Sequence, residues 1–157
     1  MSPVKILPWM VEIRRDLHRN PELGLEEHRT NGRVREILGE VGIEHRTMAQ
    51  TGVVGTLGGG EGSCVALRAD LDALPLHDGK DVEYRSRVEG KMHACGHDVH
   101  TTVLLGAARL LAERFRDFPG TVKLLFQPAE ETVGGAQMLI EEGVDLDWSD
   151  DRGINSM

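Results

Sequence analysis

The spacing of apolar residues switches between a helical and an extended period along this 157-residue chain, and the switching limits the folds that it can adopt. A helix with one apolar face, spaced at i, i+3, i+4 and i+7, is indicated by Val34, Ile37, Leu38 and Val41. The same reasoning predicts, in chain order, helices at 9–19 and 25–41, strands at 52–57 and 64–69, a helix at 99–115, a strand at 121–126 and a helix from 134. Such an alternation is typical of a layered α/β domain with a mixed sheet.

Turn-forming residues predict how these segments connect. The Gly-rich stretch 58–63 separates strands 52–57 and 64–69, so we expect those two strands to pair as a hairpin. Gly42 directly follows the second helix and suits a helix C-terminal cap. Residues 77–91 are polar and irregular, and loops of this length are often functional.

The net charge and the number of cysteines argue against several classes of function and of cellular location. Lys and Arg number 18 against 26 Asp and Glu, which gives a net charge of −8. This balance argues against nucleic acid or an anionic membrane as the main partner. No run approaches the about 20 apolar residues that a membrane span needs, and the first residues lack the pattern of a signal peptide. Cys64 and Cys95 are too few for a disulfide scaffold, so we expect a cytoplasmic location.

Side chains that can bind metals or move protons gather near the ends of the predicted elements. In open α/β sheets, ligands bind at the carboxyl ends of the strands. Two predicted strands lead into acidic pairs there, and a thiol and an imidazole precede the longest helix. The residues concerned are Asp70, Asp72, Cys95, His97, Glu130 and Glu131.

Cys95 and His97 form a Cys-x-His pair with two interpretations. Thiolate and imidazole together suit Zn²⁺ and are usable by other divalent metals. A buried cysteine beside a loop histidine is the commoner explanation of such a pair. His100 shares a helical face with His97 and either supports a site or faces solvent. Cys95 as a nucleophile is a further alternative, although nearby carboxylates would raise the pKa of a free thiol.

The acidic pairs also leave alternatives open. On extended backbone, Glu130 and Glu131 would point in opposite directions, so one could hold a metal while the other acts as a general base. A solvated helix start explains the same pair. Asp70 and Asp72 would share one face, where they either orient metal-binding side chains or close a strand before a turn.

Taken together, five segments resemble the amidohydrolase branch of the metallopeptidase-like deacylases. That family includes hippurate hydrolase, N-acyl-L-amino-acid amidohydrolases and plant indoleacetyl-amino-acid hydrolases. The segments arrive in the family's order: RRDLHRNPELGLEE (14–27), TGVVGTLGGG (51–60), VALRADLDALPL (65–76), GKMHACGHDVHTTVLLGAA (90–108) and FQPAEETVGGAQMLIEEG (126–143). The combination of ACGHD with PAEE is the most specific part of the resemblance.

The resemblance implies a three-layer αβα zinc-peptidase-like catalytic domain that hydrolyses the amide bond of N-acyl amino acids. It implies two divalent metals per site, Mn²⁺ or Zn²⁺ with Co²⁺ as a further candidate, and an enzyme that is often a homodimer. By motif, the metal ligands are Cys95, His97 and Glu131. Glu130 matches the general base, and Asp72, with Asp70 less directly, matches a residue that supports the ligands.

The chain also departs from the family. Similar enzymes are longer and carry two further ligand histidines, whereas the last histidine here is His100. We therefore expect residues 1–144 to be the N-terminal part of a truncated catalytic domain, without the inserted dimerisation domain. Residues 145–157 are expected to be a divergent, disordered tail. An exposed sheet edge should then make the chain prone to aggregation. The alternative function is a catalytically inactive remnant that binds at most one divalent metal.

Overall fold

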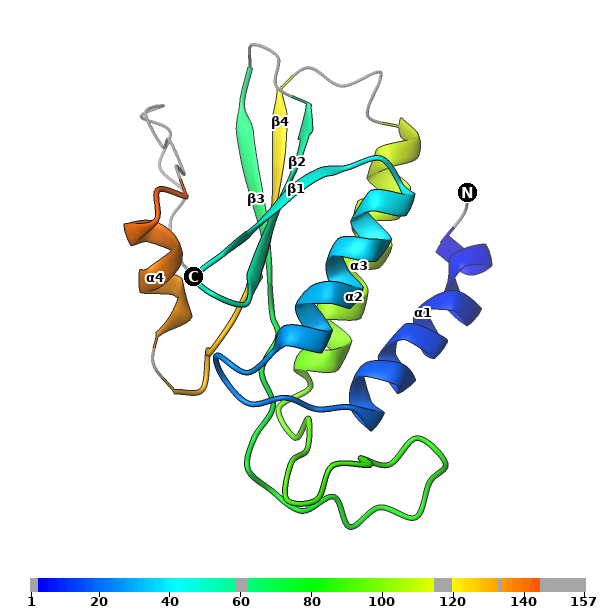
Figure 1. Ribbon diagram of the computed structural model, residues 1–157. Helices are drawn as coiled ribbons and strands as arrows, with labels where there is room; N and C mark the ends of the chain where they lie inside the picture. The colour runs from blue at the N-terminus through cyan, green and yellow to red at the C-terminus, as the bar shows by residue number, and fades with distance from the viewer. Residues whose placement is uncertain (1–2, 59–61, 115–119, 133, 145–157) are drawn as a thin grey trace, which may run out of the picture.

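The computed structural model describes residues 3–58, 62–114, 120–132 and 134–144, which form four helices and four strands (Figure 1). Their bounds, in chain order, are α1 (Pro3–Arg19), α2 (His28–Glu40), β1 (Glu44–Met48), β2 (Gly52–Gly58), β3 (Cys64–Asp70), α3 (His97–Arg114), β4 (Thr121–Gln127) and α4 (Gly135–Glu141). The expected tail, 145–157, lies outside the described residues. No helix in the described part of the chain is long and apolar enough to cross a membrane.

The sheet is mixed, as expected, but its pairing differs from the predicted hairpin. The strand order is β1-β2-β4-β3. β2 pairs antiparallel with β1 and β4, whereas β3 pairs parallel with β4. Phe126 of β4 has Val53 of β2 on one side and Ala69 of β3 on the other. The hairpin between 52–57 and 64–69 is therefore wrong, because β4, whose last four residues are buried, takes the central place between them.

The hairpin that does form joins β1 to β2, and β1 is a strand that the apolar pattern did not predict. β1 is EHRTM, in which only Met48 is buried. Its turn places Ala49 and Gln50 at positive φ, and the Thr51 N–H donates to the Ala49 carbonyl at 2.8 Å. A mostly exposed edge strand has no alternation of apolar and polar residues that would predict it. Its extended conformation is instead stabilised by pairing with β2.

The predicted helices are present with shifted ends. Gly42 has φ +73° just after α2, which confirms the predicted cap. α1 begins six residues before the predicted start and contains Pro8. Residues 77–91 form the irregular loop that the sequence predicts.

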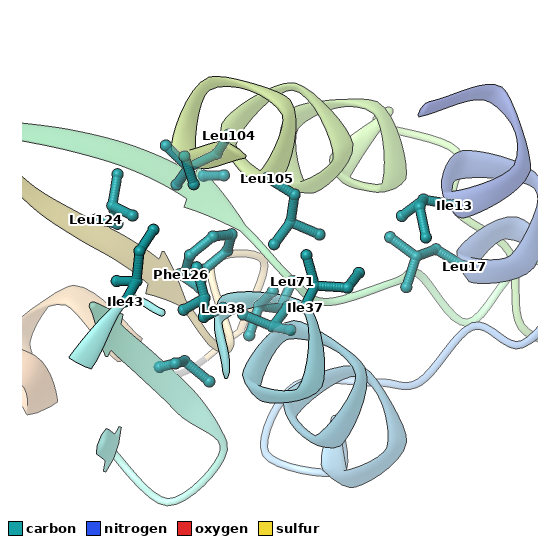
Figure 2. Close-up of a cluster of buried hydrophobic side chains, with 14 of the residues drawn as sticks. Ile13, Leu17, Ile37, Leu38, Ile43, Leu71, Leu104, Leu105, Leu124 and Phe126 are labelled. Atoms are coloured by element: carbon teal, nitrogen blue, oxygen red, sulfur yellow. The ribbon is translucent and has the colours of Figure 1, made fainter. Parts of the chain in front are cut away.

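Helices cover both faces of the sheet, which confirms the three-layer αβα arrangement (Figure 1). α1, α2 and α3 lie on one face and α4 on the other. Side chains of β4 alternate between the two cores: Leu124 and Phe126 join the larger cluster, and Leu125 joins the smaller one beneath α4. Figure 2 shows Phe126 in the larger cluster, among leucine and isoleucine side chains of α2 and α3. Burial on both faces fixes the register of the sheet.

The parallel pair β3/β4 determines where the candidate site forms. Asp70 and Gln127 are register partners at the carboxyl ends of these strands. The Leu71 N–H then donates to the Gln127 carbonyl at 2.9 Å, which keeps the two outgoing segments side by side. α3 connects the strands and begins at the same end of the sheet with His97. The fold thus brings three separate segments to one rim.

Candidate metal centre

Cys95, His97 and Glu131 lie together at this rim. One ligand atom from each residue falls within 4.8 Å of the others. The thiol comes from the loop before α3, the imidazole from the first residue of α3, and the carboxylate from the turn after β4. Sulfur, nitrogen and oxygen donors in this number suit a tetrahedral divalent ion with one position left open. The donor set therefore fits a divalent metal.

The ring of His97 is held in one orientation. It is buried, and its Nδ1 lies 2.9 Å from the backbone carbonyl oxygen of Asp72, to which it donates. This leaves Nε2 facing the centre, where it lies 3.8 Å from Glu130 Oε2 and 3.9 Å from Glu131 Oε1. Metal-binding histidines in proteins are oriented by such a bond at the other nitrogen. The hydrogen bond to the Asp72 carboxylate raises the pKa of His97 to about 9 in the metal-free chain, against the opposing effect of burial.

Asp72 connects two of the candidate ligands. It is buried, its Oδ1 lies 3.3 Å from His97 Nδ1, and its Oδ2 accepts the Glu131 N–H at 2.9 Å. Burial alone would raise the pKa of Asp72, but the hydrogen bonds from His97 and the Glu131 backbone outweigh it and lower the pKa. Asp72 therefore contacts candidate ligands from outside the centre, which is the geometry of a supporting carboxylate.

Asp70 lies differently from Asp72 although the two were expected to share a face. Its Oδ2 faces the Nε2 of His97 at 3.8 Å and the Nδ1 of His100 at 3.4 Å. Its other oxygen pairs with the Arg68 guanidinium at 2.5 Å. Asp70, His97 and His100 thus form a second group whose ligand atoms lie within 4.8 Å of one another. Because both groups use the same Nε2, and one lone pair binds one ion, they cannot both include His97 at the same time.

Glu130 and Glu131 do not lie on extended backbone. Residues 130–132 form a turn, and the preceding Ala129 has φ +49°. Both carboxylates consequently face His97 instead of pointing in opposite directions. Glu130 is the more exposed of the two, so its carboxylate is open to solvent beside the centre.

The Cys95 thiol is exposed and has Glu131 as its partner. The hydrogen bond to Glu131 raises the pKa of the thiol, and the nearby negative charges act in the same direction. A protonated thiol is a poor nucleophile. The surroundings of Cys95 therefore disfavour the cysteine-nucleophile alternative.

Two buried polar groups near the centre were not singled out by the sequence. In one, His18 lies between two carboxylates, with Nδ1 at 2.7 Å from Asp98 and Nε2 at 3.3 Å from Asp78. In the other, the carboxylate of Glu27 contacts the segment that carries Glu130. Periodicity cannot reveal such residues, because a single buried polar side chain leaves no repeating pattern.

The chain is similar to proteins of one metallopeptidase family. The sequence profile described as Peptidase family M20/M25/M40 matches residues 66–154, so the match extends into the segment expected to be a tail. IAA-amino acid hydrolase ILR1-like 2 of Arabidopsis thaliana is 53% identical over 140 residues, which are 88% of this chain and 32% of that protein. N-acetylcysteine deacetylase of Bacillus subtilis is 44% identical over 138 residues, covering 86% of this chain and 36% of that protein.

Comparison with a solved structure of this family shows that the fold is similar as well. A Bacillus subtilis protein described as a dinuclear metal binding peptidase from the M20 family superposes with a TM-score of 0.86 at 40% identity. The match covers 91% of this chain and 41% of that one. The chain thus spans about a third of the length of the curated relatives that it matches.

Proposed function

Because the chain belongs to peptidase family M20/M25/M40, we propose that it takes part in the metal-dependent hydrolysis of the amide bond of N-acyl amino acids. The observation that carries the proposal is the convergence of Cys95, His97 and Glu131 within 4.8 Å. The names of the two relatives, an IAA-amino acid hydrolase and an N-acetylcysteine deacetylase, support an amide substrate of this class.

Each residue then has a distinct role. Cys95, His97 and Glu131 would hold a divalent ion, which supplies Lewis-acid chemistry to a carbonyl group and to water. Glu130 takes a proton from the attacking water and delivers it to the leaving amine. Its carboxylate lies 3.8 Å from His97 Nε2 and is 40% exposed, so water and substrate reach it from the open side. Asp72 holds His97 and Glu131 in place.

The metal and the assembly are part of the proposal. Thiolate, imidazole and carboxylate donors suit Zn²⁺ and also accept Mn²⁺ or Co²⁺. Two ions per site, a hippurate-like substrate and a homodimer remain predictions from the family, and a cytoplasmic location remains a prediction from the small number of cysteines. The alternative is that the chain binds one ion without turnover, which is favoured by the single Nε2 that both groups of donors share.

The test is amino-acid release from N-benzoylglycine and a panel of N-acetyl amino acids, with Mn²⁺, Zn²⁺ or Co²⁺ added. Glu130→Gln keeps the shape of the side chain but cannot accept the proton, so it should lower turnover by about 10²–10⁴-fold. Binding of the metal should persist in this variant, because Glu130 is not one of the three ligands. Glu131→Gln, the matched variant one residue on, should instead weaken metal binding.

Chelation should abolish turnover, and re-addition of metal should restore it. Turnover that survives chelation, or that is unchanged in Glu130→Gln, would contradict the proposal. A folded chain that binds metal but releases no amino acid would favour the non-catalytic alternative.

A further inference from the structure

Glu27 is a buried carboxylate that joins three separate segments of the chain. Its side chain is 0% exposed, and no ion pair of Glu27 is found among the described residues. Oε2 accepts the hydroxyl of Thr51, from the β1–β2 turn, at 2.5 Å. Oε1 accepts the backbone N–H of Ala129, from the segment after β4, at 2.8 Å. The carboxylate thus links the start of α2 to the segment that carries Glu130.

The usual role of an acidic residue at a helix start does not explain this placement. Glu27 is the N-cap residue of α2, but its side chain makes no capping hydrogen bond. Glu22 performs that role instead, because its carboxylate accepts the N–H groups of Arg29 and Thr30 at 2.9 and 2.8 Å. Burial raises the pKa of Glu27, as expected for a carboxylate that has been moved out of water. The side chain is therefore buried at a cost that helix capping does not offset.

The residue that Glu27 holds is itself in an unusual conformation. Ala129 is fully buried and has φ +49°, a left-handed backbone conformation that residues other than glycine rarely adopt. Such conformations persist where the surroundings fix them. The N–H of Ala129 is fixed by Glu27, and its carbonyl accepts the Gly135 N–H at 3.3 Å. The direction in which the chain leaves Ala129 determines where Glu130 and Glu131 lie.

The Glu130–Glu131 pair is consequently held on both sides by buried carboxylates. Asp72 accepts the N–H of Glu131 at 2.9 Å, and Glu27 accepts the N–H of Ala129. Asp72 also forms an ion pair with His97, whereas no hydrogen bond or ion pair of Glu27 with a candidate ligand is found in the described part of the chain. Glu27 would act only through the backbone.

We propose that Glu27 is a positioning residue, which places the carboxylates of Glu130 and Glu131 through its hydrogen bond to the Ala129 backbone. The catalytic meaning of this role rests on the proposed function, but the placement itself does not. Loss of the bond should free the turn at 129–131 to move, while the sheet and the helices stay folded.

A set of variants separates positioning from general stability. Glu27→Ala removes both hydrogen bonds. Glu27→Gln keeps them, because its amide oxygen can accept from Ala129 while its NH₂ group donates to the Thr51 hydroxyl oxygen. Glu27→Asp keeps the charge but is one methylene too short to reach both donors, and it serves if the alanine variant does not fold. Asn31→Ala is the matched control: Asn31 is also buried, and its side chain donates from α2 to the carbonyls of Thr51 and Gly52 but makes no hydrogen bond to residues 128–131.

The first measurement is backbone amide exchange by NMR on the metal-free chain. Glu27→Ala or Glu27→Asp should speed exchange at the Ala129 and Glu131 amides more than elsewhere, and Glu27→Gln should resemble the original chain. Asn31→Ala, compared at matched global stability, should show no such selectivity. Exchange that rises evenly along the chain in the Glu27 variants, as in Asn31→Ala, would overturn the proposal.

The second measurement is Co²⁺ binding, followed by the thiolate-to-cobalt absorption of Cys95. Glu27→Ala should bind Co²⁺ about tenfold more weakly, as is typical when a residue that supports metal ligands is removed. Glu27→Gln should restore the affinity and the spectrum. If the unaltered chain shows no thiolate-to-cobalt absorption, the proposed function fails, and amide exchange still decides the role of Glu27.

Discussion

Asp78 holds the long 77–91 loop together and attaches it to α1. Its carboxylate accepts the N–H groups of Ser86 at 3.0 Å and Lys80 at 3.2 Å, and the Lys80 ammonium lies at 3.2 Å. His18 of α1 contacts it at 3.3 Å. Burial alone would raise the pKa of Asp78, but these hydrogen bonds and the Lys80 charge outweigh it and hold the pKa well below its usual value. A single side chain thus orders a segment that has no helix or strand of its own.

Asp78→Asn should make the free energy of unfolding depend less on pH in the acidic range. Because the pKa of Asp78 is lowered on folding, its contribution is complete above the ordinary value of 3.8 and is lost as the pH falls below it. The variant should lose about 1–3 kcal/mol at neutral pH, and its deficit should shrink as the pH falls below 3.8. Urea unfolding from pH 7 downward measures this, with Asp81→Asn, an exposed site in the same loop, as the control. A deficit that stays constant as the pH falls would contradict the role given to the Asp78 charge.

Single residues were predictable only where their place in the chain fixes their surroundings. The proximity of Cys95, His97 and Glu131 is such a case, because all three lie at element ends that the fold brings together; their role as metal ligands stays a prediction. The different surroundings of Asp70 and Asp72 could not be predicted, because two-residue spacing gives a face but not a side-chain direction. Asp72 lies against His97 Nδ1, whereas Asp70 turns toward Nε2 and Arg68.

At the scale of elements, the start of α4 is built against the segment that leads to the centre. A Cβ atom at Gly135 would overlap the carbonyl oxygen of Pro128, so only glycine allows the approach. Gly32, in the middle of α2, is exposed, and a Cβ atom added there would meet no atom within 4 Å. Substitution by alanine should therefore change the stability of the chain in opposite directions at these two helical glycines.

Gly135→Ala should destabilise the chain by about 1–3 kcal/mol, since either α4 or the Pro128 backbone must move. Gly32→Ala should stabilise it by about 0.5–1 kcal/mol, because alanine is the better helix residue and meets nothing. Thermal or urea unfolding of both variants checks the signs. Equal effects from the two substitutions would show that the contact with Pro128 is not limiting.

Elements were predictable in type but not in pairing. The helical period and the apolar runs located all of the elements except β1, whose side chains are mostly exposed. Sequence adjacency suggested that β2 should pair with β3, but β4, which is more completely buried than β3, lies between the two strands. Strand order depends on which strand can be buried on both faces, and that is a property of the whole sheet.

At the scale of the whole molecule, β3 forms an edge of the sheet. It pairs with β4 alone in the described part of the chain. Val65 on this strand is 52% exposed. An unpaired strand edge with an apolar side chain is a template for association with other chains.

Val65→Lys should therefore reduce self-association, because a charge on an edge strand opposes pairing. The control is Val103→Lys on α3, where the valine is 54% exposed but no strand edge is present. Sedimentation velocity at increasing concentration compares the two variants with the original chain. If both substitutions reduce association equally, exposed apolar surface in general is responsible, and not the β3 edge.

The central position of β4 also sets the order in which the sheet can be completed on the ribosome. β1, β2 and β3 are all made before residues 71–120, and β4 comes after them although it lies between β2 and β3. At about 5–20 residues per second, β2 and β3 wait for about 3–10 s before their common neighbour is made. A nascent chain in this interval presents strand edges without partners, so a molecular chaperone that shields them would act on it before the sheet closes.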